Sequence, residues 1–430
     1  MSATNLIKRH LAPKVADALH SSRIVNIVGP RQAGKSTLVK HQVPIAEYIT
    51  MDSDSIREAL RIDAYAQLRD IADHHKATGL PIVIDEVQRV PEITLALKRI
   101  VDEDNRKGQF LLTGSADVFT LASAGDSLAG RVHTLVLRPL SAAEINGAGP
   151  CRLLDAVESS PTAIMSAMPP VQAYSRTIAI DLMLRGGFPE IRTLADRQRN
   201  ARYGSYIDSI IVKDVPIVAP VRKPDLLRRL IDQLAARTAQ ELNMSKLCNA
   251  VGARKETVGG WVDTLERVCM VQRLPSWAPS AVKRATHWPK LHFLDTGCAA
   301  ALRNETAASF DMGSDPTALG AILESYFYQE LEKTLSLTGS QWHLSHWRSE
   351  NAEIDIIAEG PGRRLALFEI KASSTVTPAD FKPIDRFLDA GPGKAYAPKS
   401  VGFVVYLGNQ LLIMGQRRIC LPLSMLWSFS

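Results

Sequence analysis

Cysteine is scarce and scattered in this chain of 430 residues, and long hydrophobic runs are missing. The five cysteines form no C-x-x-C pair, which argues against a disulfide framework or a zinc site and fits reduced thiols. No apolar run approaches the roughly 20 residues that span a bilayer. No apolar segment follows the basic residues near the N-terminus. We therefore expect a cytoplasmic protein without a membrane partner.

The chain also has only a small excess of positive over negative charge. The formal net charge of +6 permits nucleic-acid binding but does not require it, because the clustering of charge matters more than its total. The apolar content of 46% is typical of a globular protein. The length exceeds what one ordinary hydrophobic core accommodates, so the sequence predicts roughly two to four domains.

Short apolar runs alternate with helical patterns up to about residue 140. Residues 23–28, 81–84 and 110–112 have the composition of buried strands, and the first of them meets a Gly-Pro turn. Such alternation is typical of a parallel sheet with helices on both faces. We therefore predict an α/β fold for this part of the chain.

A phosphate-binding loop follows the first strand. Residues 29–36 match G-x-x-x-x-G-K-[ST], in which glycines let backbone N–H groups approach phosphate oxygens. Lys35 would neutralise the β- and γ-phosphates, and the Ser36 hydroxyl would bind Mg²⁺. The absence of an N-K-x-D motif favours ATP over GTP. The predicted ATP-binding residues are Gly29, Pro30, Arg31, Gln32, Ala33, Gly34, Lys35, Ser36 and Thr37.

Polar side chains end the second and third strands. Asp85 would hold Mg²⁺ through its waters, and Glu86 would polarise the attacking water as the general base. Thr113 or Ser115 would hydrogen-bond the γ-phosphate or that water. Arg131 has two interpretations, which are an arginine finger reaching a neighbouring subunit in a homo-oligomer and an ordinary surface salt bridge.

The order and spacing of several segments resemble one family. The segments are GPRQAGKST, IDEVQ, LLTGSAD, LAGRV followed by RPLSAAE, GGFPE and LHFLDTG. They resemble the AAA-superfamily ATP-binding proteins of bacteria and archaea that carry an uncharacterised C-terminal domain of winged-helix and nuclease-like character. The resemblance covers about residues 5–410 and is weakest at 146–172, which has the composition of an insertion. It implies an AAA-like ATPase core and leaves the physiological task open.

Three helical patterns and two strands follow between residues 224 and 294, and these are the parts of a winged helix. Residues 244–251 and 255–268 suit a helix-turn-helix around Gly252. The second helix also carries acidic residues, so a structural lid or a protein-interaction module is the alternative. The candidate DNA-contacting residues are Arg254, Lys255, Thr257, Lys283 and Arg284.

A charged set near the C-terminus resembles the PD-(D/E)xK site of restriction-endonuclease-like domains. Asp355 lies on one predicted strand, and Glu369 and Lys371 share a face of the next. Glu324 lies in a preceding helix over residues 319–335. Asp355 and Glu369 would bind a divalent cation, and Lys371 would orient or deprotonate a water. The alternative is an ion-pair network in a domain that binds without cleaving.

The predicted organisation has four parts. They are a P-loop AAA-type ATPase core at 1–145, a linker or insertion with helices at 146–220, a winged-helix-like domain at 221–300 and a restriction-endonuclease-like α/β domain at 315–430. The predicted function is a Mg²⁺-dependent ATPase coupled to a module that engages DNA and can cleave it. The alternative is a nucleotide-gated switch that binds DNA or protein without cleavage. The long C-terminal half disfavours a small-molecule kinase.

Overall fold

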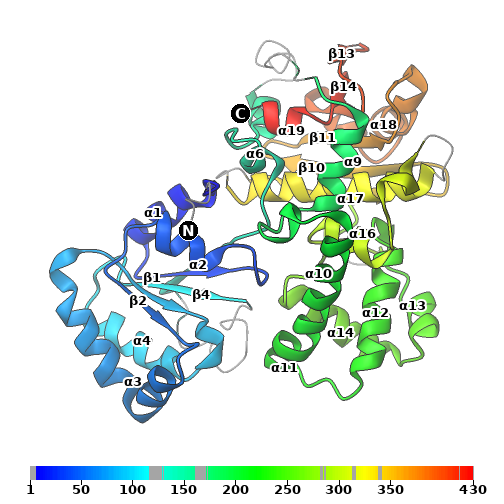
Figure 1. The fold of residues 1–430 in the computed structure, drawn as a ribbon. Coiled ribbons are helices and arrows are strands. Elements are labelled where there is room, and N and C mark those ends of the chain that lie inside the picture. Colours follow the sequence, from blue (N-terminus) through cyan, green and yellow to red (C-terminus); the bar gives the residue numbers. More distant parts are fainter. Residues whose placement is uncertain are drawn as a thin grey trace. The chain divides into compact units, whose positions relative to one another are not determined.

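The structure is a computed structural model, drawn as a ribbon in Figure 1. It describes residues 6–115, 128, 130–159, 171, 173–280, 284, 287–311, 316–337, 341–415 and 417–429. The chain forms two compact units. Unit 1 comprises residues 1–140, 208–222 and 263–270, and unit 2 comprises 141–207, 223–262 and 271–430.

Unit 1 is built on a five-stranded sheet in the order β2-β3-β4-β1-β5. All of its neighbouring strands pair in parallel, which confirms the α/β prediction for the N-terminal part. The central strands are buried on both faces, as expected for apolar segments covered by helices. The strands are β1 Ile24–Val28, β2 Glu47–Thr50, β3 Ile82–Asp85, β4 Phe110–Gly114 and β5 Val132–Val136.

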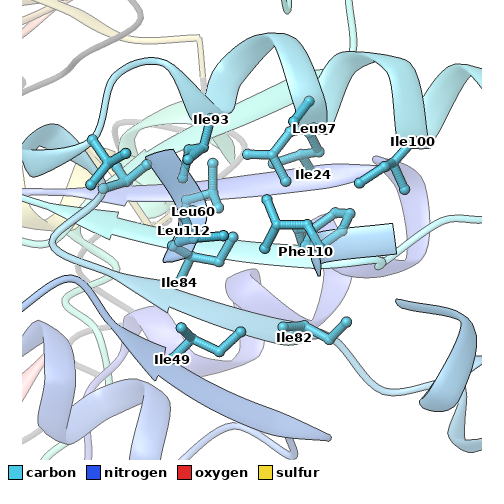
Figure 2. Packing of buried hydrophobic residues seen from close by; sticks show 14 of the residues in the cluster. Ile24, Ile49, Leu60, Ile82, Ile84, Ile93, Leu97, Ile100, Phe110 and Leu112 are labelled. Atoms are coloured by element: carbon cyan, nitrogen blue, oxygen red, sulfur yellow. The ribbon is translucent and has the colours of Figure 1, made fainter. Parts of the chain in front are cut away.

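Helices pack on both faces of this sheet (Figure 1). Helix α4 turns Ile93, Leu97 and Ile100 toward the sheet, at the spacing of one helical face. They pack against Phe110 and Leu112 of β4 (Figure 2). This packing fixes β3 and β4 side by side, so the polar residues that follow both strands meet at one edge. The helices are α1 Leu11–Ser21, α2 Lys35–His41, α3 Asp54–His74 and α4 Ile93–Glu103, with short turns η1 Lys76–Thr78 and η2 Val87–Arg89.

Unit 2 begins with helices in the region predicted as a linker. The predicted insertion at 146–172 contains helix α7, whose Leu153, Leu154 and Val157 are buried, while residues 160–170 and 172 lie outside the described part. The helical elements up to residue 302 are α6 Ala142–Ile145, α7 Leu153–Ser159, α9 Arg176–Arg185, η4 Ile191–Thr193, α10 Asp196–Ser209, η5 Ile210–Asp214, α11 Val215–Val218, α12 Pro224–Ala236, α13 Met244–Val251, α14 Lys255–Arg267 and α16 Thr296–Leu302. Of these, η5 and α11 fall in unit 1, and the last residues of α10 and α14 also fall there.

The GGFPE and LHFLDTG segments meet inside unit 2. The Asp295 carboxylate accepts hydrogen bonds from Gly187 N at 2.7 Å and from the Tyr203 hydroxyl at 2.8 Å. Gly186 has φ +66°, and a Cβ there would lie 2.2 Å from Asp295 Oδ1, so no larger side chain fits. The glycines of the first segment and the aspartate of the second are therefore explained by this contact.

A small antiparallel sheet lies between the helical region and the C-terminal part of the sequence. Its order is β6-β8-β7, with bounds β6 Gln240–Glu241, β7 Val271–Leu274 and β8 Lys290–Phe293. Helices α13 and α14, the turn at Gly252 and the β7–β8 pair occur in the order that the winged-helix prediction requires. Lys283 lies outside the described residues.

The last part of the chain forms a six-stranded mixed sheet in the order β13-β14-β12-β11-β10-β9. Strands β9, β10 and β11 are antiparallel neighbours, whereas β11, β12 and β14 run parallel. The strands are β9 His343–Arg348, β10 Glu353–Gly360, β11 Arg364–Lys371, β12 Val401–Tyr406, β13 Leu412–Ile413 and β14 Arg418–Pro422. The accompanying helical elements are η6 Ala307–Phe310, α17 Pro316–Leu335, η7 Pro378–Phe381, α18 Lys382–Asp385, η8 Arg386–Ala390, η9 Lys394–Lys399 and α19 Met425–Ser428.

Candidate nucleotide site and acidic cluster

The predicted phosphate-binding loop connects β1 to α2. Gly29 has φ +156°, and a Cβ there would lie 2.1 Å from the Leu137 carbonyl oxygen, so the loop requires glycine. The Lys35 ammonium donates to the carbonyl oxygens of Gly29 at 2.8 Å and Pro30 at 3.0 Å. Burial lowers the pKa of Lys35, although neighbouring carboxylates such as Glu86 oppose that shift. The loop therefore wraps around a buried lysine at the carboxyl edge of the sheet.

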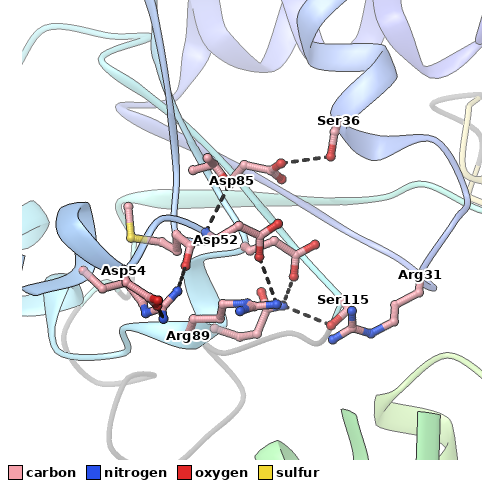
Figure 3. Close-up of polar contacts among 12 residues, drawn as sticks. Arg31, Ser36, Asp52, Asp54, Asp85, Arg89 and Ser115 are labelled. Atoms are coloured by element: carbon pink, nitrogen blue, oxygen red, sulfur yellow. Dashed lines mark hydrogen bonds and ion pairs between the residues drawn. The ribbon is translucent and has the colours of Figure 1, made fainter. Parts of the chain in front are cut away.

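Asp85 is a shared acceptor at this edge. Ser36 Oγ donates to Asp85 Oδ2 at 2.9 Å, as Figure 3 shows. The hydroxyls of Tyr48, from β2, and Thr113, from β4, also donate to the Asp85 carboxylate. Tyr48 was not predicted, and burial together with Asp85 raises the pKa of its hydroxyl. Three elements of unit 1 thus converge on one carboxylate.

The oxygen donors of Ser36 and Asp85 fit a magnesium ion. Mg²⁺ is commonly held by one or two protein oxygens together with waters and substrate phosphates, so a single carboxylate beside a hydroxyl suffices. In keeping with such a sparse donor set, the part of the chain that the structure describes has no group of three His, Cys, Asp or Glu residues placed to hold a metal.

Glu86 lies directly after β3 in the left-handed region, with φ +60°. Its carboxylate accepts from the Gln88 amide, and Gln88 Nε2 also donates to Ser115 Oγ at 3.1 Å. A non-glycine residue in this conformation costs on the order of 1–3 kcal/mol and is frequent at functional sites. The candidate base is therefore held by a neighbour that also contacts the end of β4.

An unpredicted aspartate completes this polar chain. Ser115 Oγ donates to Asp214 Oδ1 at 2.7 Å, and Arg31 of the phosphate-binding loop forms an ion pair with the other oxygen. Asp214 is buried and ends the η5 segment, which belongs to unit 1. No local pattern in the sequence announces this contact.

Within one chain, Arg131 lies at the end of the sheet opposite to the phosphate-binding loop. It precedes β5, and its guanidinium contacts the Asp102 carboxylate at 2.6 and 2.9 Å. The phosphate-binding loop follows the carboxyl end of β1, which pairs with β5 in parallel. The surface salt bridge, which was one of the two interpretations of Arg131, is therefore present. The other, a role as an arginine finger across a subunit interface, stays a prediction.

Two of the predicted nuclease-like carboxylates, Glu324 and Asp355, and the unpredicted Glu353 lie around a lysine that was not predicted either. Lys290, only 1% exposed, places Nζ 2.6 Å from Glu353, 2.8 Å from Glu324 and 3.5 Å from Asp355. Burial would lower the pKa of Lys290, but the three carboxylates outweigh it and raise that pKa. Burial raises the pKa of Glu324 well above its ordinary value. The available signal was a lysine at the start of the short strand β8, whose residues are all buried.

Glu369 and Lys371 face each other beside this cluster. Lys371 Nζ donates to Glu369 Oε1 at 2.6 Å, while Glu369 Oε2 is buried without a hydrogen-bond partner. Burial and the Asp355 charge raise the pKa of Glu369 to about 8. Asp355 Oδ2 accepts from Ile370 N at 2.8 Å. The structure thus brings all four predicted residues of this site together within an ion-pair network, and a metal role for Asp355 and Glu369 stays a prediction.

Known proteins resemble this chain in three segments. A family model of the AAA domain matches residues 21–146, so the chain carries an AAA-type ATPase domain at its N-terminal end. Two models of domains of unknown function, DUF8612 and DUF4143, match residues 176–309 and 319–426. The structure supports the first match with a parallel sheet and a phosphate-binding loop between β1 and α2.

Two curated relatives are mycobacterial proteins of unassigned function. The uncharacterized proteins Rv2008c of Mycobacterium tuberculosis and Mb2031c of Mycobacterium bovis are each 28% identical over 371 residues, covering 86% of this chain and 74% of the relative. Among solved structures, the signal-transduction ATPase PH0952 of Pyrococcus horikoshii, which has a tetratricopeptide-repeat sensor, aligns with 76% of this chain. That alignment covers 45% of the other chain at 12% identity and a TM-score of 0.28, too low to support an argument. Across the described residues, no helix combines the length and apolar character needed to cross a membrane.

Proposed function

We propose that the protein hydrolyses ATP with Mg²⁺ and that its nucleotide state controls a C-terminal module that engages DNA. The observation that carries the ATPase part is the 2.9 Å contact between Ser36 and Asp85 at the mouth of the phosphate-binding loop. A hydroxyl and a carboxylate so placed are the protein ligands that nucleoside-triphosphate hydrolases offer to magnesium.

The binding residues divide by chemistry. The backbone N–H groups of the loop, from Gly29 to Thr37, would hold the phosphate oxygens, and Lys35 would neutralise them. Ser36 and Asp85 would hold Mg²⁺, which when bound supplies positive charge against the phosphates. For this to happen, the Lys35 ammonium exchanges its carbonyl acceptors in the loop for phosphate oxygens.

Glu86 acts as general base in this proposal. It follows β3 next to Asp85, and its bond to Gln88 holds the carboxylate in one orientation. Thr113 steadies Asp85, and Ser115 is left to sense the γ-phosphate or the attacking water once it separates from Asp214. Arg131 of a neighbouring copy would complete the site if the protein forms a homo-oligomer.

The C-terminal module has two candidate activities. Arg254, Lys255 and Thr257 would contact DNA from the start of α14, and the cluster of Glu324, Asp355, Glu369 and Lys371 would cleave it with a divalent cation. The position of Lys290 favours binding without cleavage, because its ammonium already neutralises two of these carboxylates, Glu324 and Asp355, together with the neighbouring Glu353. We therefore favour DNA binding over nuclease activity.

Release of phosphate from ATP, measured with and without single- and double-stranded DNA, tests the proposal. We expect Mg²⁺-dependent hydrolysis that DNA accelerates or slows at least severalfold. Hydrolysis that ignores DNA would contradict the coupling, and no hydrolysis under any condition would contradict the ATPase assignment. Incubation of labelled DNA with Mg²⁺ or Mn²⁺ in the same samples reports on cleavage separately.

A further inference from the structure

A cavity of about 460 Å³ in unit 2 opens between the edge strand of the small sheet and the edge strand of the six-stranded sheet. It is lined from β6 by Gln240 and Glu241, and from the end of β9 by Arg348. Helices α12 and α13 contribute residues at or near their ends, and the segment before β8 contributes Trp288. The nucleotide site plays no part in it, since every lining residue belongs to unit 2.

The cavity is rich in positive charge. Arg237, Lys246 and Arg348 line it, against the single carboxylate of Glu241. Arg348 is 51% exposed on its side chain and approaches carboxylates only at 3.7 Å, on Glu241 and Glu353. Among the residues that the structure describes, none forms an ion pair with Lys246. Arg237 uses Nη1 for two oxygens of Gln233 and keeps its other donors. The three cations therefore retain donors for an anion, and phosphate is an anion that both arginine and lysine bind.

An exposed indole stands among these cations. Trp288 is 52% exposed, whereas Trp261, Trp277, Trp342 and Trp427 are buried. Its backbone is held in place, because His346 Nε2 lies 3.0 Å from the Trp288 carbonyl oxygen and His346 is itself buried. A flat, exposed aromatic surface next to cations is an arrangement on which unpaired nucleobases stack while their phosphates are neutralised.

The cavity adjoins the acidic cluster through shared residues. Glu353 contacts Arg348 at 3.7 Å with one oxygen and Lys290 at 2.6 Å with the other. Trp288 precedes Lys290 by two residues, and Lys290 pairs with Glu241 across β6 and β8. An anion bound in the cavity would therefore compete with Glu353 for Arg348.

We propose that this cavity binds a single-stranded nucleic acid, with one base stacked on Trp288 and its neighbouring phosphates on Arg237, Lys246 and Arg348. The proposal rests on the DNA-engaging role given to unit 2 above and places the contact on β6, β8 and β9 rather than on α14. An intact duplex hides its base faces, so stacking on Trp288 requires an unpaired nucleotide.

Fluorescence anisotropy of labelled ten-nucleotide oligo(dT), oligo(rU) and a DNA duplex with the full chain tests this. Trp288→Ala should weaken single-strand binding about 5- to 100-fold, as expected for one stacked base, and Trp288→Phe should recover part of the loss. Lys246→Ala should reduce affinity and flatten its salt dependence, whereas Lys394→Ala, the same change at an exposed position elsewhere in unit 2, should do neither. Tighter binding of oligo(rU) than of oligo(dT) by the unaltered chain would identify RNA as the preferred ligand.

Three results separate the proposals. Full single-strand affinity in both Trp288→Ala and Lys246→Ala would overturn the cavity assignment. If Lys255→Ala alone abolished binding, the DNA-engaging role would stand and the cavity assignment would fall. If the unaltered chain bound no nucleic acid, both would fall. A melting curve of each variant checks its fold. Substitution of an exposed side chain such as Trp288 should leave the fold unchanged.

Discussion

The Ser115 hydroxyl donates a 2.7 Å hydrogen bond to Asp214, across 99 residues of sequence. Asp214 also pairs with Arg31, so one carboxylate engages both a candidate γ-phosphate contact, Ser115, and a residue of the phosphate-binding loop. A γ-phosphate and the Asp214 carboxylate would compete for the same donors. We therefore expect the nucleotide state to influence the η5 segment through this competition.

Asp214→Asn should raise ATP affinity by about 5- to 30-fold, because removing a buried negative charge near the phosphates removes repulsion on the order of 1–2 kcal/mol. Calorimetric titration with ATP and with ADP measures it, and the effect should be larger for ATP. Asp73→Asn, which removes a charge from an exposed ion pair on α3, is the matched control. Equal affinities in wild type and Asp214→Asn would rule out the competition.

Glu86→Gln should leave ATP binding intact and slow hydrolysis about 10²- to 10⁴-fold, the usual loss when a positioned base is removed. The glutamine retains the size of the side chain and its contact with Gln88. Single-turnover hydrolysis measures the chemical step directly, and Glu92→Gln serves as a nearby control. Unchanged turnover would place the base elsewhere.

Lys290→Met should destabilise the protein by about 3–5 kcal/mol, because the buried Glu324 and the half-buried Glu353 and Asp355 lose the ammonium that neutralises them. Urea unfolding measures the loss, and adding Glu324→Gln should recover part of it. If Lys290 takes the place that a cation would occupy, Mn²⁺ should raise the melting temperature of Lys290→Met but not of wild type. A Mn²⁺ effect equal in both proteins would instead support a metal site beside Lys290.

His346 should make stability depend on pH between about 4 and 6.5. Burial lowers its pKa from 6.5 to about 4, with Lys290 adding to the shift. The unfolded chain binds the proton first, so the stability from neutral His346 is present above pH 6.5 and is lost as pH falls toward 4. The loss is about 3 kcal/mol at most. His346→Gln should flatten this slope in urea unfolding, whereas exposed His20→Gln should not; identical slopes would contradict the assignment.

Local patterns predicted which polar side chains meet at the carboxyl edge of the parallel sheet, for a physical reason. Parallel strands present their carboxyl ends at one edge, so side chains at or after the ends of β1, β3 and β4 had to meet, and Ser36, Asp85 and Thr113 do. The pairing of β10 and β11, which carry Asp355 and Glu369, was equally local, because a short turn joins these strands.

Long-range partners were not predictable in this way. Asp214 reaches Ser115 from a helical segment, and Lys290 reaches Glu324 and Asp355 from a different sheet. Neither contact has a spacing rule, because each depends on how separate elements pack. Helix α7 was missed because the Ala- and Pro-rich composition around it suggested a linker, whereas burial of Leu153 and Val157 stabilises it.

Calorimetric titration of ATP with Mg²⁺ into the wild-type protein and Lys35→Ala tests the nucleotide site most directly. We expect one binding site per chain in the wild type and at least about 100-fold weaker binding in Lys35→Ala, because the lost ammonium is the charge that faces the phosphates. Lys107→Ala, an exposed lysine of the same unit, should bind normally, and melting curves should show that all three proteins are folded. Wild-type affinity in a folded Lys35→Ala protein would contradict the assignment of the loop as the ATP site.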